Sequence, residues 1–197
     1  MTHAQAKAYA DMSDEKLAES AKKRDGLAFE ELMRRYVKQI YNFANQYART
    51  REDTDDITQD SFFKAWKNIK QFKKGRALRP WLFAIVRNTA LDYLKKKKAA
   101  PFSDLDDEIN DISFADTLED TEPLATEMFE KAEWVSALQS ILDGLHADHR
   151  AILMLHYREG LTFEEIASVV NKPMNTVKSW HRRALLKIRD MLSHRAR

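Results

Sequence analysis

The sequence predicts an all-α protein, built as two small helical domains that an acidic linker joins. The 197 residues include only 4 Gly and 4 Pro, too few for a β-protein with many tight turns, while 44% are hydrophobic. Apolar residues recur at spacings of three and four, the period of one helix face. An acidic segment without that period separates the helical stretches. We therefore expect an N-terminal helical bundle over residues 1–98, the linker over 99–125 and a C-terminal helix-turn-helix domain over 126–197.

The N-terminal domain opens with two predicted helices. Ser13 is placed to cap the first, which runs through Leu17 to Lys23 before Asp25-Gly26 breaks it. The second carries a long apolar stripe on one face. The stripe consists of Phe29, Leu32, Met33, Tyr36, Ile40, Phe43, Ala44 and Tyr47. We expect this face to lie in the core.

Two further helices complete this domain. After a polar interruption at 50–53, the third helix has on its buried side Ile57, Phe62, Phe63, Trp66 and Ile69. A loop follows at 73–76. Pro80 suits the first turn of the fourth helix, because an N–H there would have no partner within the helix. The apolar residues of the fourth helix are Trp81, Leu82, Ile85, Val86, Ala90, Leu91 and Leu94, and lysines 95–98 follow them.

Charge divides the chain into three parts, although the net charge is only +2. Residues 1–103 hold 22 basic and 13 acidic residues, 104–133 hold 1 and 12, and 134–197 hold 10 and 6. The two basic parts suit a polyanion such as DNA, which would repel the acidic part. Because no apolar period is sustained over 99–124, we expect an extended linker there. The alternative is chance clustering of surface charges.

Helical periodicity returns near Thr126. The apolar stripe of the first C-terminal helix is Phe129, Ala132, Val135, Leu138, Ile141, Leu142 and Leu145. A second helix carries Ile152, Leu153, Leu155 and Tyr157. It stops at Gly160, since glycine commonly follows the last turn of a helix. Thr162 and Glu165 form a capping box, in which each side chain accepts a hydrogen bond from the other's backbone N–H.

The capping box opens a short helix, which a turn at 171–173 separates from a longer basic helix over about 175–192. This is the layout of a helix-turn-helix, whose second helix enters the major groove of DNA. The residues expected to pack the two helices together are Ile166, Ala167, Val170, Val177, Leu185 and Ile188. The residues left outside, to contact phosphates or base edges, are Asn175, Thr176, Lys178, Ser179, Arg182 and Arg183. The alternative is an ordinary basic amphipathic helix.

Nothing in the sequence indicates catalysis or a cofactor. There is no phosphate-binding glycine loop and no supported pairing of a nucleophile with a base. His146, His149 and His156 would suggest a metal, but a helix break intervenes and the chain has no Cys, so we expect no metal site. No apolar run approaches the ~20 residues of a membrane span, and the N-terminus lacks a signal-peptide core. Together with the absence of Cys, this favours the cytoplasm.

Four groups of residues, taken in order, match the pattern of one family. The first is Ala28-Phe29-Glu30-Glu31-Leu32, and the second is 55–62 with Ala65-Trp66. The third is 81–85 with 87–90 and 92–94, and the fourth is 165–167 with 176–179 and Arg183-Ala184. Their order and spacing resemble the extracytoplasmic-function sigma factors of bacterial RNA polymerase, over about residues 13–98 and 126–192.

This resemblance implies a sigma factor that binds core RNA polymerase and promoter DNA. The implied polymerase-binding residues are Asp56, Gln59, Asp60 and Phe63. In the family, the loop matched by residues 74–79 captures a flipped base of the −10 element. The implied −10 DNA-binding residues are Gly75, Arg76, Ala77, Leu78, Arg87, Asn88 and Lys95. Asn88 matches the residue that contacts the opened strand, whereas Arg87 and lysines 95–98 would hold phosphates.

The resemblance also implies that the long basic helix binds the −35 element, and that an inhibitory anti-sigma factor covers both partner-binding surfaces. The sequence departs from the family at Trp180, where an Arg is common, and at Leu185, where a basic residue is frequent. It also departs at Asn175, which replaces a frequent Gly and is placed to act as an N-cap. Trp180 could contact DNA or pack inward, and packing is favoured. Two other functions stay open, a stand-alone helix-turn-helix regulator and a nucleic-acid-modifying enzyme.

Overall fold

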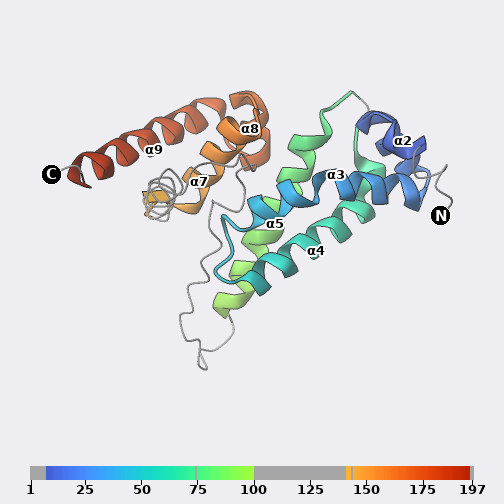
Figure 1. Ribbon diagram of the computed structural model, residues 1–197, viewed down its shortest axis with the longest axis horizontal. Coiled ribbons are helices and arrows are strands. Elements are labelled where there is room, and N and C mark those ends of the chain that lie inside the picture. Colours follow the sequence, from blue (N-terminus) through green and yellow to red (C-terminus); the bar gives the residue numbers. More distant parts are fainter. Residues whose placement is uncertain (1–7, 74, 100–140, 143, 196–197) are drawn as a thin grey trace, which may run out of the picture. The chain divides into compact units, whose positions relative to one another are not determined.

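Two compact units, one N-terminal and one C-terminal, make up the chain (Figure 1). The computed structural model describes residues 8–73, 75–99, 141–142 and 144–195. Within these ranges every regular element is a helix, which confirms the predicted all-α class. The expected linker beyond Ala99 and the helix expected to start near Thr126 lie outside the described residues, apart from the end of that helix. No helix in the described ranges is long and apolar enough to cross a membrane.

The N-terminal unit is a helical bundle whose helices start at polar capping residues. Its elements are α2 (Asp14–Lys22), α3 (Gly26–Ala44), α4 (Arg51–Asn68), the 3-10 helix η1 (Ile69–Gln71) and α5 (Leu78–Ala99). Ser13, Asp25 and Thr50 each accept a hydrogen bond from a backbone N–H in the first turn of the helix that follows. The cap predicted at Ser13 is confirmed. Asp25 does more than end α2, because its carboxylate starts α3.

Phe43 of α3 and Phe83 of α5 lie at the centre of the N-terminal core. Both are 0% exposed, and their rings meet edge to face with centroids 5.0 Å apart. The predicted stripe of α3 is confirmed, since all its members are buried except Met33, which is half-buried. From α4, Ile57, Phe62 and Ala65 add to this core. The helices are therefore held mainly by apolar packing along one face of each.

A buried carboxylate pins the beginning of α4 to the end of α5. Asp53 is 3% exposed, and the Tyr93 hydroxyl donates to its Oδ1 over 2.7 Å. Lys97 Nζ donates to both carboxylate oxygens, at 2.9 and 3.0 Å. Burial raises the pKa of Asp53, but the hydrogen bonds from Lys97 and Tyr93 outweigh it and hold that pKa below its usual value. The expectation that Lys97 holds a phosphate is therefore wrong for this state, since its ammonium is bound to Asp53.

Arg35 ties α2 to α3 by a second polar network. Its guanidinium donates to Asp14 Oδ1 and to Glu31 Oε1, each over 2.8 Å. The hydroxyl of Tyr36 donates to the other oxygen of Asp14. The hydrogen bonds from Arg34 and Arg35 lower the pKa of Glu31 to about 2, against the effect of burial. The first helix is thus held by charged hydrogen bonds as well as by its buried alanines and leucine.

The C-terminal unit has the predicted helix-turn-helix. Its elements are α7 (Ala147–Leu153), the π-helix η3 (Met154–Arg158), α8 (Phe163–Val170) and α9 (Met174–Arg195). The capping box is confirmed: Thr162 N–H donates to Glu165 Oε2 over 2.9 Å, and Glu165 N–H donates to Thr162 Oγ1 over 3.2 Å. Gly160 ends the preceding helix with a φ of +66°, also as predicted.

The core of this unit differs from expectation at one position of α9. Ile166, Val170 and Val177 are buried, but Leu185 is 40% exposed. Its neighbour Ala184, at 0% exposed, fills the interior position instead. Successive residues of a helix point about 100° apart, so a register error of one residue moves a side chain from the core to the surface.

Replacing Lys97 with Ala should destabilise the N-terminal unit by about 1.5–3 kcal/mol, because the buried Asp53 carboxylate would lose a charged donor. Hydrogen exchange of peptides from residues 8–99 of the full chain, measured in increasing urea, gives the free energy of local unfolding. Lys96→Ala is the matched control, since Lys96 is exposed on the same helix. Equal stabilities for the two variants would show that the buried pair contributes nothing.

Candidate nucleic-acid interface

α4 carries an exposed surface that is both acidic and aromatic. Asp56, Gln59, Asp60 and Phe63 recur at spacings of three and four and are all exposed. We call these four residues the α4 face. Phe63 is 66% exposed, so its assignment to the buried side of the helix is wrong. Carboxylates beside an exposed aromatic ring repel DNA but fit a protein partner that offers apolar contact and arginines.

The α4 face is held rigidly by what lies behind it. The opposite side of the helix buries Ile57 and Phe62 in the core. The Tyr93 hydroxyl, bound to Asp53, also lies 3.5 Å from Asp56 Oδ2. The orientation of the α4 face is therefore fixed by the same contacts that join α4 to α5.

A basic loop, residues 73–77, joins η1 to α5, and Lys74 within it lies outside the described residues. The N–H of Arg76 donates to the carbonyl of Lys73 over 3.2 Å. Gly75 has a φ of +82°, a conformation that side chains with a Cβ rarely adopt. Gly75, Arg76 and Ala77 are all exposed. The loop thus has an exposed backbone at Gly75 and an exposed guanidinium at Arg76.

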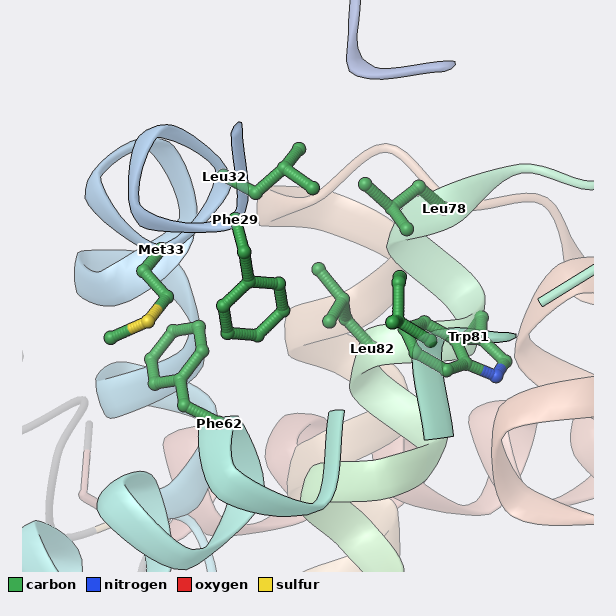
Figure 2. A pocket seen from close by; sticks show the side chains of 8 residues that line it. Phe29, Leu32, Met33, Phe62, Leu78, Trp81 and Leu82 are labelled. Carbon is green, nitrogen blue, oxygen red and sulfur yellow. The ribbon is translucent and has the colours of Figure 1, made fainter. Parts of the chain in front are cut away.

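Leu78 does not belong to this exposed surface, contrary to expectation. It is 5% exposed and begins α5, where it faces the apolar residues of α3 (Figure 2). A small cavity lies there, lined by Phe29, Leu32, Met33, Phe62, Ile69, Leu78, Trp81 and Leu82. It offers about 10 Å³, room for about one water molecule, and its lining is apolar. Leu78 therefore anchors the loop from beneath, and this cavity cannot take a base.

Arg87 and Asn88 of α5 have opposite environments. Asn88 is exposed, in agreement with a role toward DNA. Arg87 is only 7% exposed and so is not available to a phosphate in this state, which contradicts the sequence prediction. Lys95 is exposed near the C-terminal end of the helix. The outward surface of α5 therefore offers Asn88 and Lys95, whereas Arg87 belongs to the interior.

The outer surface of α9 carries the residues predicted to bind DNA. Asn175, Lys178, Arg182 and Arg183 are exposed, and Thr176 and Ser179 are half-buried. The carbonyl of Pro173 accepts from the N–H groups of Thr176 and Val177, at 2.9 and 3.2 Å. The helix therefore begins at Met174, and Asn175 lies in its first turn. The N-cap role expected of Asn175 is wrong, but its side chain points to solvent.

Trp180 packs within the C-terminal unit, as the sequence favours. It is half-buried, and its ring centroid lies 5.9 Å from that of His149, on α7. The ring centroid of His146 also lies 5.9 Å from that of His149. Burial and the neighbouring His146 lower the pKa of His149. Trp180, which stands where an Arg is common in the family that the sequence resembles, thus supports α9 against α7.

A second aromatic cluster joins η3, α8 and α9, and the sequence analysis did not predict it. The ring of His156 stacks on Phe163 with centroids 4.6 Å apart, and its Nδ1 lies 3.0 Å from the carbonyl oxygen of Leu161. His181 of α9 meets His156 at 5.4 Å, and its Nε2 lies 3.0 Å from the Tyr157 hydroxyl. Burial, followed by the proximity of His156, lowers the pKa of His181. In the described parts of the chain no three metal-ligating side chains gather.

The comparison with known families gives two matches, one for each unit. The model described as Sigma-70 region 2 matches residues 32–100, which include the α4 face, the 73–77 loop and α5. The model described as Sigma-70, region 4 matches residues 136–188, which include the helix-turn-helix. The α4 face, the 73–77 loop and the exposed surface of α9 therefore lie in the matched segments.

Curated relatives match over most of their length. The ECF RNA polymerase sigma-E factor of Haemophilus influenzae is 27% identical over 186 residues, covering 93% of this chain and 95% of that protein. The ECF RNA polymerase sigma factor SigM of Mycobacterium tuberculosis is 30% identical over 170 residues, covering 86% of this chain and 80% of that protein.

Solved structures share the fold. CnrH in complex with the cytosolic domain of CnrY has a TM-score of 0.64 at 24% identity, covering 92% of this chain and 97% of that one. The sigma factor RpoE, in complex with the anti-sigma factor NepR from Bartonella quintana, has a TM-score of 0.59 at 21% identity, covering 84% of this chain and 96% of that one.

The histidine clusters should make the C-terminal unit less stable in mild acid. Because the folded-state pKa of His149 and His181 lies below 6.5, the unfolded state binds more protons just below that pH. This stability is present above pH 6.5 and is lost as the pH falls through the folded-state pKa values. Hydrogen exchange of peptides from 144–195 should accordingly accelerate, after correction for intrinsic rates, between about pH 7 and pH 5.5. The double variant His149→Leu, His181→Leu should lose most of this pH dependence. If its hydrogen exchange depended on pH as in the parent chain, the two histidines would not be the cause.

Proposed function

The chain belongs to the extracytoplasmic-function family of RNA polymerase sigma factors, and we propose how its residues divide the work of that function. It is a sigma factor that binds core RNA polymerase and directs transcription initiation at promoters. The proposal rests on one observation: a single helical unit carries both the acidic and aromatic α4 face and a basic loop. The backbone of that loop is exposed at Gly75, which has a positive φ. A protein that only represses a promoter needs the DNA-reading helix alone.

The α4 face binds the polymerase. Its carboxylates would be repelled by DNA, whereas Arg side chains on a protein partner would meet them. Phe63 supplies an apolar anchor that becomes buried only in the complex. The protein contact is thereby separated from the residues that meet DNA.

The 73–77 loop and α5 bind the −10 element. A base that leaves the stack loses a few kcal/mol, which contacts at the receiving site must offset. The open backbone at Gly75 allows close approach, and the guanidinium of Arg76 can bind a base edge or a phosphate. Asn88 contacts the opened strand, and Lys95 contacts its phosphates. Leu78 and Arg87 take no direct part, since both side chains are buried.

The exposed surface of α9 binds the −35 element in the major groove. Arg182 and Arg183 are suited to guanine or phosphate, and Asn175 to adenine or phosphate. Lys178 adds charge without sequence information. Trp180 contributes by holding α9 against α7 through His149 rather than by contacting bases.

The regulation and the cellular location proposed for this chain are those typical of the family. An anti-sigma factor covers the partner-binding surfaces until a signal releases the chain, which acts in the cytoplasm, where the polymerase is. The chain makes and breaks no covalent bonds, and the polymerase supplies the active site. Promoter-dependent run-off transcription by core polymerase with the purified chain tests this assignment. No such product, together with tight and specific binding of duplex DNA by the free chain, would instead support a stand-alone regulator.

Replacing Phe63 with Ala should weaken binding to core polymerase by about 30-fold or more, because a central aromatic anchor is worth about 2 kcal/mol or more in such interfaces. Fluorescence anisotropy of the labelled chain, titrated with core enzyme, measures this affinity. Lys67→Ala, one turn further along the exposed side of α4, is the matched control. A loss of affinity as large in the control would argue against a specific α4 face.

Replacing Arg76 or Asn88 with Ala should impair open-complex formation about tenfold or more, which corresponds to about 1.4 kcal/mol, with a smaller effect on binding of duplex −35 DNA. The loop and α5 meet DNA only once the strand is opened, whereas α9 meets the closed duplex. Permanganate reactivity of promoter thymines reports opening, and a gel-shift assay with holoenzyme on duplex DNA reports the earlier step. If both steps fell equally, these two residues would have another role.

A further inference from the structure

We propose that the C-terminal end of α2 extends the DNA-binding surface of the N-terminal unit and binds phosphates of the opened strand beside the 73–77 loop. The site consists of the exposed cations Lys23, Lys70, Lys73 and Arg76, which we call the α2–loop strip. This inference rests on the proposed function, because it requires that the loop engages DNA. It adds to that function a contact made by the first helix of the bundle.

One cation–ring contact holds the last turn of α2 against the root of the loop, and a second holds the residues that follow α2 against α4. Lys22 Nζ lies 5.4 Å from the ring centroid of Phe72, the residue directly before the loop. The guanidinium of Arg24 lies 5.3 Å from the ring of Trp66. Phe72 also packs on Trp81, with centroids 5.3 Å apart, at the other end of the loop. In Figure 1 α2 accordingly lies beside the segment that connects η1 to α5.

The backbone at this point turns so that α2 ends abruptly. Arg24 has a φ of +68°, a conformation that residues with a Cβ rarely adopt. Its N–H donates to the carbonyl of Ala21 over 2.9 Å, which closes the end of the helix. Lys23, directly before this turn, is left exposed at the corner.

The charge of this corner is positive, because three cations, Lys22, Lys23 and Arg24, lie beside two carboxylates, Glu19 and Asp25. Glu19 accepts from Lys22 over 2.8 Å. The carboxylate of Asp25 caps α3 through two N–H groups and accepts from the Tyr9 hydroxyl. Among the described residues, none of the four cations of the strip is ion-paired with a carboxylate. The strip therefore presents cations just before the loop, within it and at the neighbouring end of α2.

A DNA strand fits this surface better than an acidic protein segment. A base held at the loop leaves its flanking phosphates directly beside it, where the cations of the strip can bind them. The protein partner of this unit is instead matched by the α4 face, whose charge is opposite. Lysines that bind the phosphates of a DNA strand do not read bases. Their contribution to binding therefore depends on salt and not on the DNA sequence.

Lys23→Ala tests the strip, with Lys16→Ala as the matched control, because Lys16 is an exposed lysine at the other end of α2. Holoenzymes carrying each variant are titrated with fork DNA, duplex at −35 and single-stranded at −10, built on a promoter recovered by holoenzyme transcription of genomic fragments. The magnitude of the slope of log affinity against log salt should fall by about 0.7 for Lys23→Ala, the value for one contact to a single-stranded phosphate. It should stay unchanged for Lys16→Ala.

Two outcomes overturn the inference. One is a salt slope for Lys23→Ala equal to that of the parent holoenzyme. The other is a loss of affinity for core polymerase without a change in slope, which would make the strip a protein contact. Failure of the proposed function is read separately, because it would abolish transcription by the parent holoenzyme before any variant is compared.

Discussion

The buried carboxylate of Asp53, held by Tyr93 and Lys97, is the interaction on which the functional geometry of the N-terminal unit depends. It joins the first turn of α4 to the last turns of α5, so the two helices run in opposite directions. Their other ends meet around Phe62, Leu78 and Leu82. The α4 face and the exposed Asn88 and Lys95 of α5 are therefore fixed with respect to one another by a polar contact at one end and apolar packing at the other.

Such a contact costs stability before it contributes any, because a carboxylate must leave water. It offsets this cost through three hydrogen bonds to charged or hydroxyl donors, each stronger in the interior than at the surface. Unlike an apolar pair, this contact also fixes the position of α4 along α5. A leucine at this position could slide along the neighbouring helix, whereas two donors on α5 accept only one position for the carboxylate of α4.

The sequence predicted the described helices, the cap at Ser13, the capping box of Thr162 and Glu165 and the helix-turn-helix, because these depend on local spacing and on single capping side chains. It failed where one residue of register decides the outcome. Phe63 and Leu185 were assigned to buried sides of their helices, since a stripe of apolar residues does not say where its edge lies. Leu78 was placed in the DNA-binding loop by the resemblance, although its side chain is buried. Arg87 was assigned to DNA by the resemblance, although the packing of α5 buries it. The cluster of His156 and His181 could not be foreseen, because it depends on the mutual placement of η3, α8 and α9.

The segregation of charge within the N-terminal unit has a consequence for how the two partners can be bound together. Asp56 and Asp60 lie on α4, whereas the cations that surround the loop lie beyond its C-terminal end, on η1, the loop and α2. At physiological salt the screening length is about 8 Å, so each partner responds mainly to the charge directly in front of it. DNA that approached the α4 face would be repelled, and the polymerase surface that binds carboxylates would be repelled by the loop. The unit therefore accepts both partners at once in one orientation, which a uniformly basic domain could not enforce.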